Sequence, residues 1–147
     1  MRTTLGIACL FTTLGCGGGQ TFQLAKVEGV CLCEGQPISS GRIIFQPFKE
    51  GKAKEVGKAA LADIDPNGRF ELMTNRSGDG AVVGKHTVQV LGRYIEDDSD
   101  KAAVAAAKLP CASPENLVVE VKAGQTNSFE IKMGPKRNPQ MAGPVDK

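Results

Sequence analysis

This 147-residue chain contains five cysteines and one histidine, and these side chains can take part in the widest range of reactions. A thiolate can be acylated, form a disulfide or bind a soft metal ion, and an imidazole can bind a metal or transfer a proton. The cysteines form two groups, because two lie within the first 16 residues and the others are Cys31, Cys33 and Cys111. The two groups need separate explanations.

The first 15 residues have the composition of an export signal. Arg2 provides a basic start, and Leu5–Leu14 is apolar apart from Gly and Thr. This run is shorter than the roughly 20 apolar residues of a spanning helix. The small residue Gly15 precedes Cys16, as it would at a signal cleavage site. We therefore expect cleavage between Gly15 and Cys16 and lipidation of the Cys16 thiol, as in a bacterial lipoprotein.

The surroundings of Cys16 also permit an ordinary secretory signal that is cleaved nearby. Thr13 stands three residues before Cys16, where Leu is more common in lipoprotein signals, whereas the glycines after Cys16 favour lipidation. Cys9 is a weaker site because little apolar sequence precedes it. We expect residues 16–25 to be a flexible Gly-rich tether. The predicted location is a membrane of the cell envelope. Each acyl methylene group buried in the bilayer contributes about 0.8 kcal/mol, so multiple acylation would make release from the membrane slow.

The charge and aromatic content limit the classes of partner. The chain has 18 basic and 16 acidic residues, a net charge of +2, and no basic stripe of the kind that nucleic-acid binders have. Trp is absent and Tyr94 is the only tyrosine, so stacking platforms for bases or sugars are not expected. We expect a membrane, through the lipid, and an unknown protein or glycan as partners, with no nucleic acid and no cofactor.

After the tether, the sequence predicts one all-β domain over residues 26–133. Apolar residues alternate in short segments separated by Gly, Pro and Asn, which is typical of a sandwich or barrel. The seven expected strands are residues 27–33, 42–48, 56–64, 69–74, 85–91, 117–122 and 128–133. Asp65–Gly68 has the composition of a tight hairpin turn. Seven strands in about 110 residues fit a Greek-key β-sandwich.

Two segments depart from the strand pattern. Lys101–Lys108 is rich in alanine, and Asp98 or Ser99 can cap its start, so we expect one short surface helix near 98–108. Pro110 would end it. Residues 134–147 contain three prolines and no periodicity, and we predict a disordered tail there.

Five stretches carry turn and core residues in a recognisable order, namely Val27–Pro37, Gly41–Pro47, Ala62–Leu72, Gly84–Val88 and the closing part from Leu109 to Ile131. Together they resemble carboxypeptidase-regulatory-like domains, and small bacterial surface lipoproteins place one such domain after a Gly-rich spacer. The resemblance implies a prealbumin/transthyretin-like sandwich without catalytic activity. It rests on positions that specify a fold rather than a site.

Three interpretations stay open for the cysteines of the domain. Cys31 and Cys33 share one face of the first strand, because alternate residues of a strand point the same way. We favour small buried thiols for both and for Cys111. A disulfide from either one to Cys111 is an alternative, since an exported chain meets an oxidising compartment. The rival function is metal handling through Cys31, Cys33 and Cys111, with His86 as a further ligand.

The remaining motifs favour structural roles. His86 shares a face with Val88 and Val90, so we expect a buried, aromatic-like side chain. Asp63–Gly68 matches the first half of an EF-hand loop, but Thr74 stands where the loop needs its bidentate Glu, and we expect a plain hairpin. No His-Glu-x-x-His or Gly-x-Ser-x-Gly motif occurs. The expected function is therefore structural or binding, without catalysis.

Overall fold

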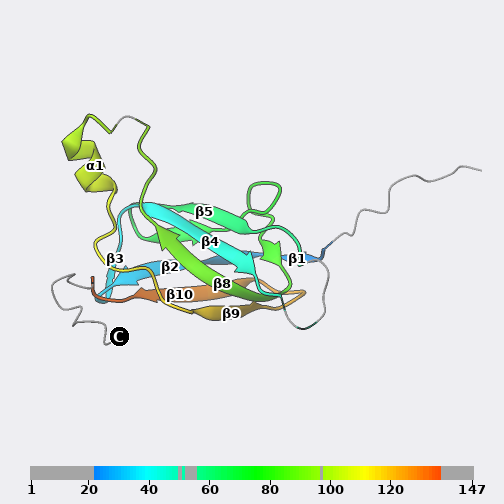
Figure 1. The fold of residues 1–147 in the computed structure, drawn as a ribbon. Helices are drawn as coiled ribbons and strands as arrows, with labels where there is room; N and C mark the ends of the chain where they lie inside the picture. The colour runs from blue at the N-terminus through cyan, green and yellow to red at the C-terminus, as the bar shows by residue number, and fades with distance from the viewer. Residues whose placement is uncertain (1–21, 50, 52–55, 97, 137–147) are drawn as a thin grey trace, which may run out of the picture.

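The computed structural model describes residues 22–49, 51, 56–96 and 98–136. Within these ranges the protein is mostly β, with several sheets and one short helix (Figure 1). In one sheet, β2 (Val27–Cys33) pairs with β10 (Asn127–Met133), with β6 (Arg69–Glu71) and with β3 (Gln36–Pro37). A second sheet has the order β5 (Ala60–Ile64), β4 (Gly41–Pro47), β8 (Gly84–Leu91) and β9 (Val118–Val121).

Each of the seven expected strands has a counterpart, and three further strands have only two residues each. One of the short strands, β3, extends the first sheet. The other two, β1 (Leu24–Ala25) and β7 (Ala81–Val82), form a separate antiparallel ribbon. The Leu24–Ala25 strand lies inside the predicted tether, and Ala25 is buried. A strand of two residues is too short to show an alternating pattern, which explains why these strands were not predicted.

The first and last long strands of the domain lie side by side in parallel. The register of β2 and β10 runs from Val27 opposite Asn127 to Cys33 opposite Met133. The Asn127 side chain strengthens this junction, because its amide donates to the Lys26 and Lys122 carbonyl oxygens at 3.3 and 3.0 Å. Strand order of this kind depends on contacts between distant segments, so the alternating pattern alone did not predict it.

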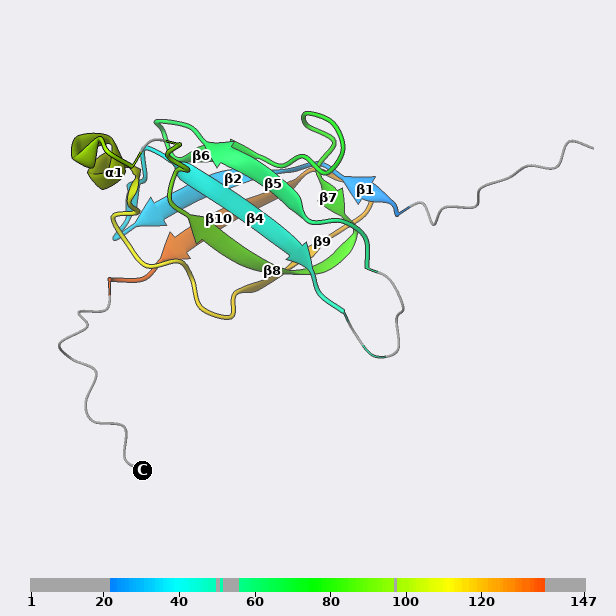
Figure 2. The ribbon, with the colours of Figure 1, turned by 45° about the horizontal axis from the view of Figure 1, so that its top comes forward.

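The two larger sheets pack against each other around Phe45 of β4. Its ring centroid lies 6.2 Å from that of Phe70 and 5.7 Å from that of Phe129, both in the other sheet. As predicted, Ile43 and Phe45 share a buried face of β4. In Figure 2 the two sheets overlap, and the strands of one run in a different direction from those of the other. The core is therefore a single apolar layer between two sheets.

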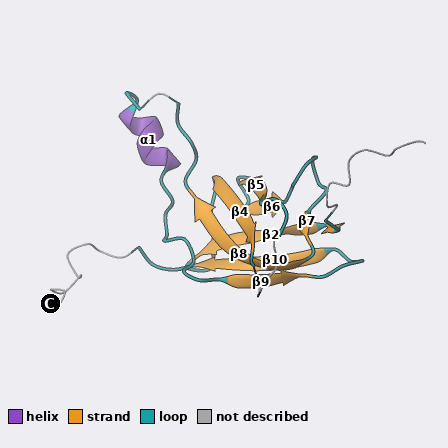
Figure 3. Cartoon of the chain, turned by 45° about the vertical axis from the view of Figure 1, so that its right-hand side comes forward, coloured by secondary structure: helices purple, strands orange, loops and turns teal. Residues whose placement is uncertain are grey.

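The helix α1 (Lys101–Ala107) begins later than expected. Asp100, rather than Asp98 or Ser99, caps it, because Asp100 Oδ1 accepts the backbone N–H groups of Ala102 and Ala103 at 3.0 and 3.1 Å. The helix stands beside the sheets, at the end of the domain opposite to β1 (Figures 1 and 3). Only Ala107 of the helix is buried.

The hydrogen bonding of the closing segment continues one residue past the predicted end of the strand at residue 133. Gly134, the first residue of the predicted tail, accepts a hydrogen bond from the Ala112 N–H at 2.9 Å. The rest of that tail, from residue 137 onward, lies outside the described residues.

Candidate functional site

The predicted cleavage and lipidation site, Gly15 and Cys16, lies outside the described residues. The structure therefore describes where the domain begins rather than the anchor itself. Phe22 is the first described residue, and it leads into β1 at the end of the domain remote from α1 (Figure 1). In the part of the chain that the structure describes, no helix is long and apolar enough to span a membrane.

A disulfide joins Cys33, at the end of β2, to Cys111 in the segment after α1. The S–S distance is 2.04 Å and the Cα–Cα distance is 5.7 Å, within the usual range for a disulfide. The two residues are 78 positions apart in the sequence. Cys31 is a free thiol with no exposed surface. The structure thus has a disulfide for one pair of cysteines and a buried thiol for the third, instead of three buried thiols.

The residues of the alternative metal site do not assemble. Cys33 and Cys111 are bonded to each other, so they have no thiolates to offer a metal. Burial raises the pKa of the Cys31 thiol to about 12, which keeps it protonated and unreactive near neutral pH. Among the described residues, no group of three His, Cys, Asp or Glu side chains could hold a metal ion.

His86 is a core residue, as its position in the strand predicted. Its ring is 1% exposed and lies 5.9 Å from the ring of Phe45. Nδ1 is 3.1 Å from the Gly84 carbonyl oxygen, whereas Nε2 is buried without a hydrogen-bond partner. Burial lowers the pKa of His86, because the charged form loses its hydration. The histidine is therefore placed as a neutral, packed ring without access to a substrate.

The motif that partly matches an EF-hand is a hairpin turn. The backbone N–H groups of Asn67 and Arg69 donate to Asp65 Oδ1 at 2.8 and 2.9 Å. The Asp63 carboxylate lies on β5 and forms an ion pair with Arg42, at 2.8 Å. The two carboxylates thus already have partners within the chain, in agreement with the plain hairpin that the sequence predicts.

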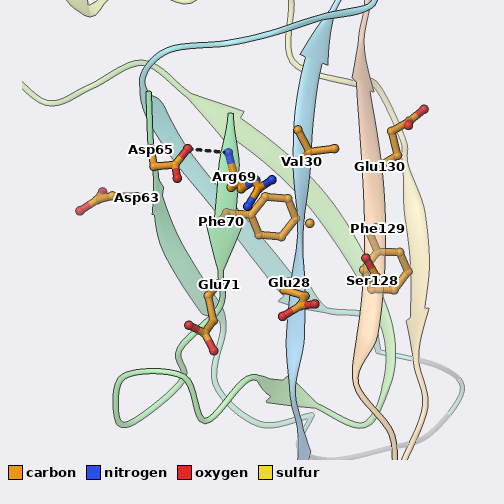
Figure 4. Close-up of a pocket in the computed structure, with 11 residues that line it drawn as sticks. Glu28, Val30, Asp63, Asp65, Arg69, Phe70, Glu71, Ser128, Phe129 and Glu130 are labelled. Carbon is orange, nitrogen blue, oxygen red and sulfur yellow. Dashed lines mark hydrogen bonds between the residues drawn. The ribbon is translucent and has the colours of Figure 1, made fainter. Parts of the chain in front are cut away.

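The outer face of the first sheet contains a groove, which we call the sheet-face groove (Figure 4). Pairing between strands aligns Glu28 of β2 with Glu71 and Ser128, and Val30 with Arg69 and Glu130. All of these side chains belong to the outward-pointing positions of their strands. The groove is therefore shallow, polar and rich in carboxylates.

Gly29 allows the strands beneath this groove to pack closely together. It lies between Phe70 on β6 and Phe129 on β10 in one row across the sheet. A Cβ atom at this position would overlap the Phe129 carbonyl oxygen and lie 2.6 Å from Phe70 Cζ. Only glycine fits, and the strands on either side bring two aromatic residues next to it. The sequence pattern did not show that this position requires glycine.

Most carboxylates of the sheet-face groove are paired with cations of the same molecule. Lys26 Nζ is 3.0 Å from Glu71, and Lys132 Nζ is 3.3 Å from Glu130. The hydrogen bond and the charge of Glu71 raise the pKa of Lys26. These pairs are solvent-exposed, so each contributes little to stability. The groove has the character of a solvated sheet surface rather than a reactive centre.

A second groove lies between α1 and the chain that follows β8, and we call it the helix groove. Its apolar lining includes Tyr94, Ile95, Val104 and Leu109, and its floor includes the disulfide residue Cys111. Three basic residues also line it, namely Arg93, Lys108 and Lys136. This groove was not predictable from the sequence, because its residues come from three segments without a shared periodicity. The only signal was the single tyrosine of the sequence, Tyr94, three residues after the end of β8.

Comparison with family models, with curated proteins and with solved structures gave no match.

Proposed function

We propose that this protein is an exported lipoprotein, held at a membrane by acyl chains on Cys16, whose β domain has a structural or binding role. The observation that carries the proposal is the Cys33–Cys111 disulfide. Stable disulfides are characteristic of oxidising compartments outside the cytosol, which is where an export signal would send the chain. The short apolar run before Gly15 and Cys16 supplies that signal.

The sheet arrangement supports the finer proposal for the fold, a Greek-key sandwich of the prealbumin/transthyretin type. The strands that resemble carboxypeptidase-regulatory-like domains are distributed over two sheets that pack around Phe45. The hairpin with the turn Asp65–Gly68 crosses from one sheet to the other, because β5 and β6 belong to different sheets. Crossings of this kind are common in such sandwiches.

Three features of the described residues support a non-catalytic role. The Cys31 thiol is buried with a raised pKa, and His86 is buried with a lowered pKa. Carboxylates such as Asp63, Glu71 and Glu130 have cationic partners within the molecule. These are the properties of groups that maintain a fold, whereas catalytic groups are accessible and tuned toward the working pH.

The direction of the chain supports display of the domain. The described chain begins at one end of the domain, and α1 lies at the opposite end (Figures 1 and 2). A lipid on Cys16 would hold the first end close to the membrane and leave the helix end facing away from it. The partner class that we propose is a protein or a glycan.

Cell fractionation after expression in a bacterium tests the anchor. We expect the wild-type protein in the membrane fraction and Cys16→Ala outside it. Cys9→Ala is the matched control, because it removes the other cysteine of the signal and should leave the protein on the membrane. A Cys16→Ala variant that stays with the membrane would refute lipidation at this residue.

A further inference from the structure

We propose that the helix groove binds a segment of a partner protein in which carboxylates flank an apolar side chain. The proposal deepens the function given above and rests on it in one respect, the display of the helix end away from the membrane. The residues that carry it are Tyr94, Arg93, Lys108 and Lys136, together with the apolar lining of the groove.

The two walls of the groove are fastened to each other and to the sheets. The Arg93 N–H donates to the Ala107 carbonyl oxygen at 3.0 Å, which ties the chain after β8 to the last turn of α1. Gly92 permits this approach, because a Cβ atom there would collide with the Ala107 carbonyl oxygen. The disulfide of Cys111 attaches the floor to β2. A fastened groove loses little conformational freedom when a ligand binds.

The groove has an exposed apolar lining, and burial of this lining by a ligand is favourable. Tyr94 is 81% exposed, although it lies beside the aliphatic residues Ile95, Val104 and Leu109. Tyrosine is enriched among the residues that contribute most to protein interfaces, since its ring is apolar and its hydroxyl can form a hydrogen bond. Covering this ring and its neighbours favours an apolar side chain in the ligand.

The basic residues around the lining determine which charge the ligand should carry. Arg93, Lys108 and Lys136 are exposed, and no ion pair within the described residues involves them. Asp98 is the one carboxylate among the described lining residues. Unpaired cations next to an apolar surface are complementary to a ligand with carboxylates, and such complementarity speeds association and excludes basic competitors.

Other anionic partners fit less well. A nucleic acid would need more basic surface than a chain with 18 basic and 16 acidic residues provides. An anionic membrane would meet this groove only if the domain lay on its side or inverted, because α1, which lines the groove, lies at the end of the domain remote from β1 (Figure 1). A protein segment uses both the cations and the apolar lining.

Tyr94 makes the test specific, because the chain contains no tryptophan and no other tyrosine. Tyrosine fluorescence of the full chain carrying Cys16→Ala therefore reports on the helix groove. The probe is a short peptide of alternating Glu and Leu, which contains no aromatic residue. We expect a saturable change in Tyr94 emission with this peptide, and none with the alternating Lys-Leu or Glu-Ser peptides. Because Cys16 is replaced, the result does not depend on whether the natural protein is acylated.

Variants locate the binding. Arg93→Glu with Lys108→Glu should weaken binding of the Glu-Leu peptide about tenfold or more, since it reverses two charges at the groove. Lys132→Glu, on the sheet face, is the matched control and should leave binding unchanged. Equal binding of the Lys-Leu peptide, equal weakening by Lys132→Glu, or no saturable signal would overturn the proposal. A comparable signal with an oligothymidylate, or concentration-dependent self-association without peptide, would also overturn it.

Discussion

The two grooves of the domain differ in how their charges are satisfied. On the sheet face, Glu71 and Glu130 pair with Lys26 and Lys132 of the same molecule. In the helix groove, Arg93 and Lys108 have no ion pair within the described residues and lie next to apolar side chains. A surface whose charges are already paired within the molecule attracts a charged partner only weakly. A charged partner is therefore expected at the helix groove rather than on the sheet face.

The two regions also differ in what holds them. The sheet-face groove belongs to strands that are hydrogen-bonded along their length and packed on the core. The helix groove lies outside the two sheets and is held by the disulfide, by the backbone hydrogen bonds of Arg93 and Ala112, and by the packing of Leu109 on the core. Damage to the core should affect both, whereas loss of the disulfide should affect the helix groove first.

The largest expected effect is therefore loss of the disulfide. Cys33→Ser or Cys111→Ser should lower the free energy of unfolding by about 4 kcal/mol, because the bridge closes a loop of 78 residues. The change in Tyr94 emission with the Glu-Leu peptide should weaken at the same time. Denaturant unfolding and the fluorescence titration measure the two effects. The double variant should lose no more than either single one, and an unchanged stability would contradict the structural role of the bridge.

The next effect concerns the sheet face. Gly29→Ala should lower the free energy of unfolding by about 2 kcal/mol or more, since its Cβ would collide with β10 and with the Phe70 ring. Gly134→Ala is the matched control, because nothing lies within 4 Å of a Cβ there. Thermal unfolding of both variants checks this expectation. Equal stability of the two would mean that the strands can separate at Gly29 without cost.

A smaller effect comes from His86 and depends on pH. Its pKa is lowered in the folded protein, so the unfolded chain takes up a proton first as the pH falls below about 6.5. Stability should therefore decrease on acidification, with a slope of at most about 1.4 kcal/mol per pH unit from this one group. His86→Phe should remove that part of the slope in denaturant titrations between pH 7 and pH 5. The same slope in both proteins would show that His86 is not the responsible group.

The smallest effect separates the two grooves most clearly. Glu71→Gln and Arg93→Gln should each change the free energy of unfolding by less than about 0.5 kcal/mol, because both side chains are solvent-exposed. Only Arg93→Gln should weaken the binding of the Glu-Leu peptide. Calorimetric melting measures the stability of each variant, and the Tyr94 titration measures its binding of the peptide. Weaker binding by Glu71→Gln would show that the sheet face takes part in peptide binding.

Much of this architecture follows from local patterns in the sequence. The alternation of Ile43 with Phe45 placed β4 and its buried face, and Asp65–Gly68 placed the hairpin, because these signals need only neighbouring residues. The parallel pairing of β2 with β10 was not predictable in this way, since it joins segments about 100 residues apart in the sequence.

The site residues show the same limit. The favoured prediction of three buried thiols was right only for Cys31, and the alternative disulfide to Cys111 was left open between Cys31 and Cys33, which share a strand face. The choice depends on how far along β2 the segment after α1 lies. The helix groove was not predicted, because Arg93, Lys108 and Lys136 approach one another only after α1 is tied to Arg93.

The most direct test of the central proposal is the intact mass of the natural protein extracted from membranes. We predict a chain that starts at Cys16, carries acyl chains on that residue, and is lighter by two hydrogens for the Cys33–Cys111 bond. Reduction should add those two hydrogens and leave the acyl chains in place. A mass that corresponds to an unacylated chain, or to one that retains residues 1–15, would contradict the account.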